Sequence, residues 1–249
     1  NLADMKITEE VLPEFRQFSD SFNQMLERLD EGFTAQRQFT GNAAHELRTP
    51  LALMQAQVEL FSAEHPDVLP ETADFLRLLR EQTERMTQMT RTLLEMCGLQ
   101  AVPCTDHIEL GPMIDEIFAD LAPLAEKNNV MLEREGDGTM TGSDTLIYRL
   151  LFNLTENAIK YNRPGGSVRL SVTPEPEKLL IRVSDTGPGI PERFQRSVFQ
   201  PFFRVDKSRS REYGGVGLGL SLVWEIVKLH GGTVCVENSS EAGTTVAVS

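Results

Sequence analysis

The amino-acid sequence predicts two units of different fold class: a helical hairpin that pairs with a second copy as an antiparallel four-helix bundle, and an α+β sandwich. Within residues 1–98, apolar residues recur at alternating steps of three and four, which is typical of helices packed in a coiled coil. Two prolines in residues 62–70 interrupt this pattern and separate two helices. From about residue 109, amphipathic helices mix with strands of alternating polarity, so we expect one mixed sheet with helices on one face.

The composition agrees with this assignment, because 249 residues suit two domains, and 40% hydrophobic with 24% charged residues suit a folded chain. The formal net charge is -13. A protein that binds nucleic acid usually presents a basic face, so we expect no nucleic-acid partner. The sequence has no run of about 18 apolar residues, so we expect no membrane-spanning helix within it. Because it begins with Asn1 and not with Met, we expect a fragment of a longer protein.

The cysteines are few, which is typical of a reducing compartment. They are Cys97, Cys104 and Cys235. Cys97 and Cys104 lie near His107, but this spacing matches no common zinc site. We therefore interpret these residues as packing residues.

The first predicted helix changes its apolar repeat near its middle. Between Phe15 and Leu29 the apolar residues alternate in steps of three and four, whereas from Phe39 to Leu51 they recur every four residues. Such a stutter locally unwinds a supercoil. We therefore expect the packing of this helix to change between Phe39 and Leu51.

The second predicted helix keeps one apolar repeat from Phe75 to Met96, and Gly98 and Pro103 end it. One hairpin cannot bury both faces of its apolar seam, whereas two hairpins can, so we expect a homodimer. The predicted seam consists of Phe15, Phe18, Phe22, Met25, Leu29, Phe39, Ala43, Leu47, Leu51, Met54, Val58 and Phe61 in the first helix and of Phe75, Leu79, Gln82, Met86, Met89, Leu93 and Met96 in the second.

His45 lies in the segment where the repeat changes. It precedes Leu47 by two residues, about 200° around a helix, so we expect it to point away from the seam. A lone surface histidine usually has no function, but its neighbours favour one. Glu46 can accept a hydrogen bond from the ring, and Thr49 lies one turn further on the same side. Pro50 leaves the carbonyl of Glu46 without its helical partner, so we expect a bend there.

The second unit contains three predicted helices and five predicted strands. We expect the helices at residues 108–129, 143–162 and 218–231, and the strands at residues 130–135, 167–174, 178–185, 233–238 and 244–249. Ser143 or Asp144 is the expected cap of the second helix. Residues 186–217 form a long irregular segment, and such a segment is usually functional or disordered.

Two asparagines of the second helix, Asn153 and Asn157, are four residues apart and therefore share one face. Their amide oxygens could bind a hard cation such as Mg²⁺, and asparagine is otherwise unfavourable inside a helix. Lys160 and Tyr161 follow and could supply a cation for phosphate and a ring for stacking. An ordinary row of surface asparagines is an equally good interpretation of this pattern alone.

A strand ends at Asp185, and Gly187 and Gly189 then turn the chain. Glycines let a backbone approach a ligand closely, and a carboxylate can accept a hydrogen bond from the exocyclic amine of adenine. An ordinary β-turn is the common cause of this short pattern.

Four glycines, Gly214, Gly215, Gly217 and Gly219, lead directly into the last helix. Backbone N–H groups at a helix N-terminus form a natural phosphate site, although the spacing matches neither a P-loop nor a Rossmann motif. Basic residues gather just before them, which suits a lid over phosphates. These residues are Arg204, Lys207, Arg209 and Arg211.

Five motifs, by their order and spacing, resemble those of the cytoplasmic part of bacterial transmembrane sensor histidine kinases. FTGNAAHELRTPLA resembles the H box, LLFNLTENAIKYN the N box, DTGPGI the G1 box, FQPFFR the F box and GGVGLGL the G2 box. The resemblance covers nearly the whole chain. It implies that the second unit is a Bergerat-fold domain like those of gyrase and Hsp90. PEFRQFSDSFNQMLERL also resembles the second helix of a HAMP signalling domain.

The resemblance implies four segments. They are the C-terminal part of a HAMP domain at 1–30, a dimerisation and histidine phosphotransfer hairpin at 31–98, a hinge linker at 99–108 and a catalytic ATP-binding domain at 109–249.

The same resemblance implies roles for individual residues. His45 is then the phospho-acceptor, Glu46 assists the transfer, and Thr49 positions water when the domain dephosphorylates its partner. Asn157 binds Mg²⁺, with Asn153 beside it. The residues implied in ATP binding are Asn153, Asn157, Lys160, Tyr161, Asp185, Gly187, Gly189, Arg204, Gly215, Gly217, Leu218 and Gly219.

The implied function is ATP-dependent autophosphorylation on His45, followed by transfer to an aspartate of a response regulator in a two-component system. The implied parent protein is anchored in the bacterial plasma membrane by segments absent from this chain. Three alternatives remain: an ATPase that drives a conformational clamp, a scaffold that has lost kinase activity, and a predominantly phosphatase enzyme.

Overall fold

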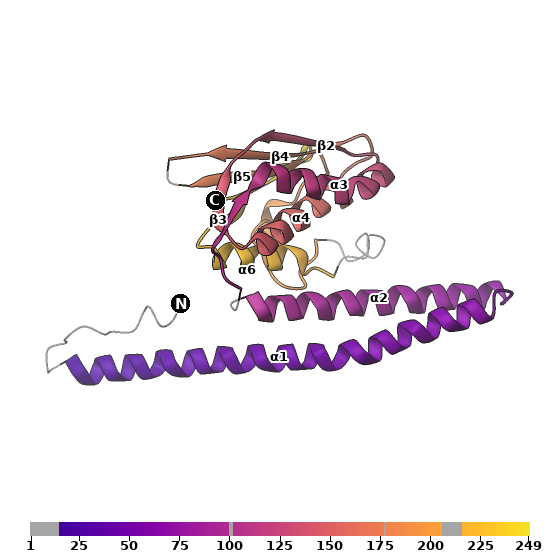
Figure 1. Cartoon of the computed structure of the whole chain (residues 1–249), viewed down its shortest axis with the longest axis horizontal. Helices are drawn as coiled ribbons and strands as arrows, with labels where there is room; N and C mark the ends of the chain where they lie inside the picture. Colours follow the sequence, from indigo (N-terminus) through magenta and orange to yellow (C-terminus); the bar gives the residue numbers. More distant parts are fainter. Residues whose placement is uncertain (1–14, 100–101, 177, 206–215) are drawn as a thin grey trace.

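The computed structural model describes residues 15–99, 102–176, 178–205 and 216–249, which form a long helical hairpin and an α+β domain (Figure 1). In the hairpin, α1 spans Arg16–Glu64 and α2 spans Pro70–Gly98. Both helices and the break between them agree with the prediction. The break lies where proline at the first position of α2 fits a helix start but could not continue α1.

The contact between α1 and α2 uses small and branched residues. Ala44 and Leu51 of α1 and Thr83 and Thr90 of α2 are buried. The threonine hydroxyls donate to carbonyls of their own helix, as in the bond of 2.8 Å from Thr83 Oγ1 to the Leu79 oxygen. Their polar atoms are therefore satisfied without a partner from the other helix.

Most of the predicted seam does not form this contact and lies on the surface of the single chain. Phe39 keeps 75% of its surface exposed and Phe75 keeps 60%. The other large seam residues that remain exposed are Phe15, Phe18, Met25, Leu29, Leu47, Met54, Phe61, Leu79 and Met86. Monomeric proteins seldom expose an apolar row of this length.

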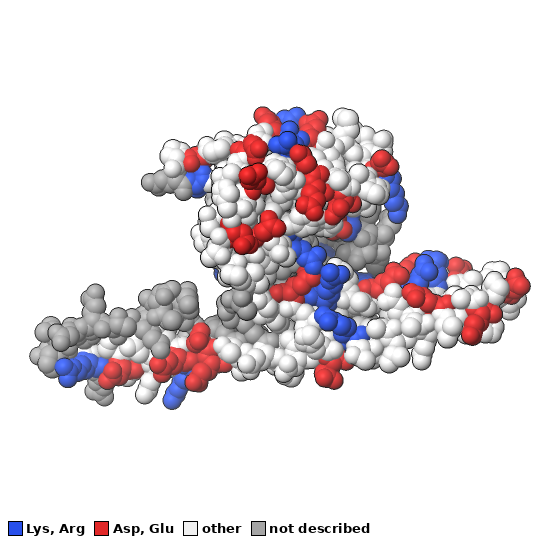
Figure 2. Space-filling model, viewed as in Figure 1, with Lys and Arg blue, Asp and Glu red and all other residues white. Residues whose placement is uncertain are grey.

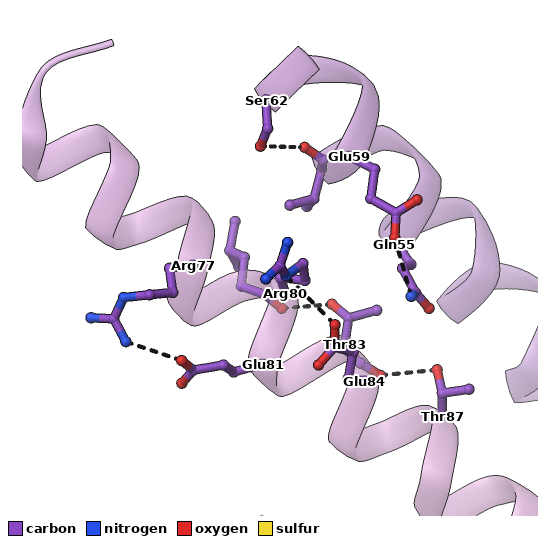
Figure 3. A network of polar contacts seen from close by, with 11 residues as sticks. Gln55, Glu59, Ser62, Arg77, Arg80, Glu81, Thr83, Glu84 and Thr87 are labelled. Carbon is purple, nitrogen blue, oxygen red and sulfur yellow. Dashed lines mark hydrogen bonds and ion pairs between the residues drawn. The ribbon is translucent and has the colours of Figure 1, made fainter. Parts of the chain in front are cut away.

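Charged and polar pairs cover another part of the hairpin near its turn (Figure 3). Gln55 donates to Glu59 at 3.3 Å, and Arg77 donates to Glu81 at 3.0 Å. These residues are one helical turn apart and exposed, so each pair contributes only a few tenths of a kcal/mol.

Pro50 lies inside α1, which continues as one helix to Glu64. Figure 1 shows that α1 bends in its second half, the half that contains Pro50. The missing N–H of Pro50 removes one bond of the helical ladder, and such a loss commonly bends a helix without ending it.

The α+β domain is built on one mixed sheet, as predicted, and its five strands lie in the order β2-β4-β5-β7-β6. Only β2 and β4 pair in parallel. The strands are β2 Met131–Gly136, β4 Ser167–Pro174, β5 Leu179–Asp185, β6 Val234–Ser240 and β7 Gly243–Val248.

Helices α3 Leu110–Asn128, α4 Asp144–Lys160 and α6 Gly219–Leu229 cover one face of this sheet (Figure 1). Two short 3₁₀ turns, η4 Glu192–Phe194 and η5 Ser197–Phe199, lie in the long irregular segment. Residues from each helix and from the sheet share one core and are fully buried, which supplies the main stabilisation of this domain. They include Ile114, Ile117, Leu151, Ile159, Val168, Leu170, Val223 and Ile226.

A second, two-stranded sheet was not predicted. Here β1 Asp106–Glu109 pairs antiparallel with β3 Thr139–Gly142. The expected hinge linker therefore ends in a strand, and the helix expected from residue 108 begins at Leu110. Four-residue strands show no usable alternation, and this pair is set by contacts across about 30 residues of sequence.

Candidate functional site

The two asparagines of α4 lie against the first residue of α6. Asn153 donates from Nδ2 to the carbonyl of Arg149 at 2.7 Å, which fixes the orientation of its amide. A Cβ atom at Gly219 would lie 3.1 Å from Asn153 Oδ1 and 3.6 Å from Asn157 Nδ2. The start of α6 therefore approaches both amides closely, and the two motifs that were separate in the sequence form one site.

The end of α4 reaches the Asp185 turn. Lys160 pairs with Glu156 at 2.7 Å in this structure, and Tyr161, at the C-cap of α4, is 43% exposed. A Cβ atom at Gly187 would lie 2.7 Å from the carbonyl oxygen of Tyr161. The backbone of the turn therefore packs directly on the end of this helix.

Asp185 ends β5 with a half-buried carboxylate. Its Oδ1 accepts bonds from the backbone N–H groups of Gly187 at 2.7 Å and Thr244 at 3.2 Å. Burial raises the pKa of Asp185, and these two bonds and the positive charge of Arg163 lower it by less. Within the described residues no donor reaches Oδ2, so this oxygen is the one that can accept a hydrogen bond from a ligand.

The turn after Asp185 requires glycine at Gly189, because its φ is 78° and a Cβ atom there would collide with the carbonyl oxygen of Ser240. The next residue, Ile190, donates its N–H to Ser239 Oγ at 2.7 Å. The end of β6 therefore packs on this turn and helps to hold it.

Arg204 is the first of the basic residues predicted to lie over the phosphates. Its Nε and Nη2 atoms are buried and have no hydrogen-bond partner in the part of the chain that the structure describes. Beside it, Gly217 has a φ of 81°, and Phe202 donates its N–H to the Gly217 carbonyl at 2.8 Å. Leu218, which follows, is buried and anchors the start of α6.

Part of the predicted phosphate loop lies outside the described residues. This applies to Lys207, Arg209, Arg211, Gly214 and Gly215.

His45 is exposed on α1, as expected, and so are Glu46 and Thr49. It lines a shallow groove between the two helices of the hairpin. The other residues of this groove are Thr34, Gln38, Gly41 and Asn42 of α1 and Leu94, Cys97 and Gly98 of α2.

An ion pair joins the α+β domain to the same turn of α2. Glu95 accepts from Arg149 of α4, and also from Arg91 at 3.3 Å. Figure 2 shows basic and acidic side chains next to each other where the upper domain meets the hairpin. Arg149 lies one helical turn before Asn153, and Glu95 lies next to the α2 residues that line the groove beside His45. The ion pair therefore links the α4–α6 site to the part of the hairpin that carries His45. Arg149 was not among the predicted site residues, since an isolated charge on a helix gives no signal of its distant partner.

Two family models match the chain in the order that these elements imply. Residues 35–97 match the His Kinase A (phospho-acceptor) domain, and residues 142–249 match the Histidine kinase-, DNA gyrase B-, and HSP90-like ATPase. A phospho-acceptor hairpin followed by an ATPase domain of this type defines the class of protein.

With both of these domains, the chain belongs to the histidine kinase family. It is 31% identical over 245 residues to the signal transduction histidine-protein kinase ArlS of Staphylococcus aureus. The matched stretch covers 94% of this chain and 53% of ArlS. The chain therefore spans about half the length of the curated relatives that it matches.

Solved structures show the same fold. The catalytic domain of the histidine kinase ThkA is 28% identical, with a TM-score of 0.50, over 58% of this chain and 94% of that one. Full-length ShkA in complex with AMPPNP has a TM-score of 0.68 and 20% identity over 85% of this chain and 45% of that one. Among the described residues, no helix has the length and apolar character needed to cross a membrane.

Proposed function

We propose that this chain binds ATP, transfers the γ-phosphoryl group to His45 and passes it to an aspartate of a response regulator. The strongest support is Arg204, whose buried Nε and Nη2 donors lack a partner among the described residues. Leaving charged donors unsatisfied inside a protein is costly, and phosphate oxygens can accept from two of them at once.

The phosphate site is completed by the N-terminus of α6. This helix begins at Gly219, close to Asn153 and Asn157, and its first N–H groups favour an anion. The AMPPNP complex of ShkA supports a nucleotide in a domain of this fold. At the other end of the site, Asp185 Oδ2 would accept from the adenine amine, and Tyr161 would lie beside the ring.

Mg²⁺ fits the donor set of α4. Asn157 and Asn153 offer amide oxygens, the hard ligands that Mg²⁺ prefers, and both side chains are half-buried beside the phosphate site. When bound, the ion neutralises charge on the phosphate oxygens. Lys160 would leave Glu156 to contact a phosphate.

In the transfer itself, a ring nitrogen of His45 attacks the γ-phosphorus, the bond to the bridging oxygen breaks and ADP leaves. The proton on the ring passes to Glu46, which follows His45 in α1 and is also exposed. The P–N bond then breaks when an aspartate oxygen of the regulator attacks the phosphorus. In the separate phosphatase reaction, Thr49 would orient a water molecule that attacks the phosphorus of the regulator's aspartyl phosphate and releases inorganic phosphate.

The two halves of the reaction need different partners at His45, so we infer that the α+β domain moves relative to the hairpin. The groove beside His45 and the Glu95–Arg149 pair lie in the same turn of α2. The segment 99–108 remains our predicted hinge, although its last residues form β1.

We also propose a homodimer and a membrane-anchored parent. The exposed seam of α1 and α2 supports the dimer, because a second hairpin would bury it. The chain's coverage of only 53% of ArlS supports a longer parent. A HAMP remnant in residues 1–30 stays a prediction, and residues 1–14 lie outside the described range.

The proposal is tested with γ-labelled ATP and Mg²⁺. We expect acid-labile label on the wild type and none on His45→Gln, whereas His65→Gln, a matched change of an exposed histidine, keeps it. Label on His45→Gln would contradict the acceptor. Nucleotide hydrolysis without labelled protein would favour the clamp ATPase, and absence of nucleotide binding would favour the scaffold.

The phosphatase role needs its own variant. We expect Thr49→Ala to slow dephosphorylation of a regulator and to leave autophosphorylation intact. If both reactions keep their wild-type rates, the role of Thr49 is wrong. Mixing His45→Gln and Asn157→Asp chains decides the direction of transfer, because label in the mixture requires transfer between subunits.

A further inference from the structure

Arg163 lies just beyond α4 and has no role in the proposal above. Its Nη2 donates to two backbone carbonyls, that of Gly187 at 3.0 Å and that of Glu241 at 2.6 Å. The first carbonyl belongs to the turn after Asp185, and the second to the turn between β6 and β7. One guanidinium therefore ties the end of α4 to both turns.

A second set of bonds holds the same turn from the side of α4. Thr186 donates from Oγ1 to Asn162 Oδ1 at 3.0 Å and accepts from the N–H of Ser167 at 2.9 Å. Asn162 Oδ1 also accepts from the N–H of Arg163 at 2.9 Å. These bonds fix the backbone from which Arg163 extends, so the position of the guanidinium is set before any ligand binds.

The charge of Arg163 also acts on Asp185. Burial raises the pKa of this carboxyl, and Arg163 is the basic group that opposes the effect. An ionised carboxylate accepts hydrogen bonds only, which matches the two donors of an adenine amine better than a protonated acid does.

We propose that Arg163 is a positioning residue for adenine: by holding the Gly187 carbonyl and the β6–β7 turn, it fixes the Asp185 carboxylate for the exocyclic amine. The inference rests on the proposed function, and it assigns base selectivity to a residue that does not touch the nucleotide. Without Arg163 the turn keeps its fold through Thr186, and the Asp185 carboxylate keeps its bonds from Gly187 and Thr244. The Gly187 carbonyl loses its charged donor, however, so the turn that places the carboxylate is held less closely.

The test uses Arg163→Gln in the full chain, with Arg169→Gln as the matched control, because Arg169 on β4 forms an exposed ion pair with Glu133 on β2. Affinities for ATP and for inosine triphosphate, which carries a carbonyl in place of the exocyclic amine, are measured with Mg²⁺. We expect Arg163→Gln to lose about tenfold in ATP affinity, with little change for inosine triphosphate, since bonds from a charged donor are lost.

The autophosphorylation rate at saturating ATP should stay near the wild-type value, so the effect falls on KM and not on kcat. Equal loss for both nucleotides with a lower thermal midpoint would overturn the proposal in favour of a merely structural role, and so would unchanged affinities. If Arg163→Gln does not fold, Arg163→Lys is measured instead. The proposal then requires this variant to lose affinity for ATP relative to inosine triphosphate. A wild type that binds no ATP would instead refute the proposed function.

Discussion

The helical hairpin and the α+β domain differ in how much apolar surface one chain can bury. The α+β domain closes a core from three helices and a sheet, with residues such as Leu151 and Ile226 fully buried. The hairpin leaves Phe39, Phe75 and the other seam residues exposed. The domain expected to hold the nucleotide therefore buries its core within one chain, whereas the hairpin that carries His45 leaves most of its predicted seam on the surface of the chain.

The largest expected effect tests whether the α+β domain is self-contained. Leu151→Ala would leave a cavity in its core and destabilise that domain by about 2–5 kcal/mol. Trp224 of α6 is the single tryptophan of the chain, so its fluorescence during urea unfolding reports on this domain alone. We expect a lower midpoint that does not depend on protein concentration. A concentration-dependent midpoint would show that the domain also needs a partner.

The next effect tests the incomplete hairpin. Leu47→Glu places a charge in the exposed seam, and we expect sedimentation to show dissociation of a dimer with the tryptophan transition unchanged. Leu53→Glu is the matched control, because Leu53 is also exposed but lies outside the predicted seam. Equal behaviour of the two variants would mean that the seam is not the dimer interface.

A smaller effect is expected from Asp185, where a substitution should affect ATP binding without lowering the stability of the α+β domain. The pKa of Asp185 is raised by burial, so between the ordinary and the raised value the folded state binds more protons than the unfolded state. The contribution of Asp185 to stability is therefore largest at low pH and falls as pH rises through this window. We expect Asp185→Asn to leave the thermal midpoint at pH 7 unchanged or higher while ATP binding is lost.

Asp137→Asn is the control for this variant. Asp137 also accepts two backbone N–H bonds, from Gly111 at 2.8 Å and Gly138 at 2.7 Å, but it is exposed. It should keep ATP binding. A clear drop in the thermal midpoint of Asp185→Asn at pH 7 would contradict the expectation that the buried, ionised carboxylate does not stabilise the fold at this pH.

The smallest expected effect concerns Pro50, inside α1 near His45. Pro50→Ala restores one backbone bond and straightens the helix, with little effect on stability expected in a helix that is already continuous. We expect it to shift the ratio of autophosphorylation to phosphatase rates. An unaltered ratio would remove Pro50 as a candidate switch in the hairpin.

Some of the fold and site could be predicted because the signals are local. Helical and strand periodicity located α1, α2, α4 and the five strands of the main sheet. The residue types and spacing around His45, Asn157 and Asp185 indicated a chemistry before any geometry was known. Ser143, one of the two predicted caps, is the N-cap residue of α4, but its side chain forms no capping bond. The N–H of Ser143 donates instead to His230 Nε2 at 3.0 Å, a contact that the sequence did not predict.

The sequence by itself determined the order of elements, the two domains and the residue types of the site, because periodicity and turn chemistry act over a few neighbouring residues. Only the tertiary structure decided the pairing of β1 with β3, the Glu95–Arg149 contact and the place of Arg163 between two turns. These contacts join residues from about 24 to 80 positions apart, and their geometry exists only once the core has set the elements side by side.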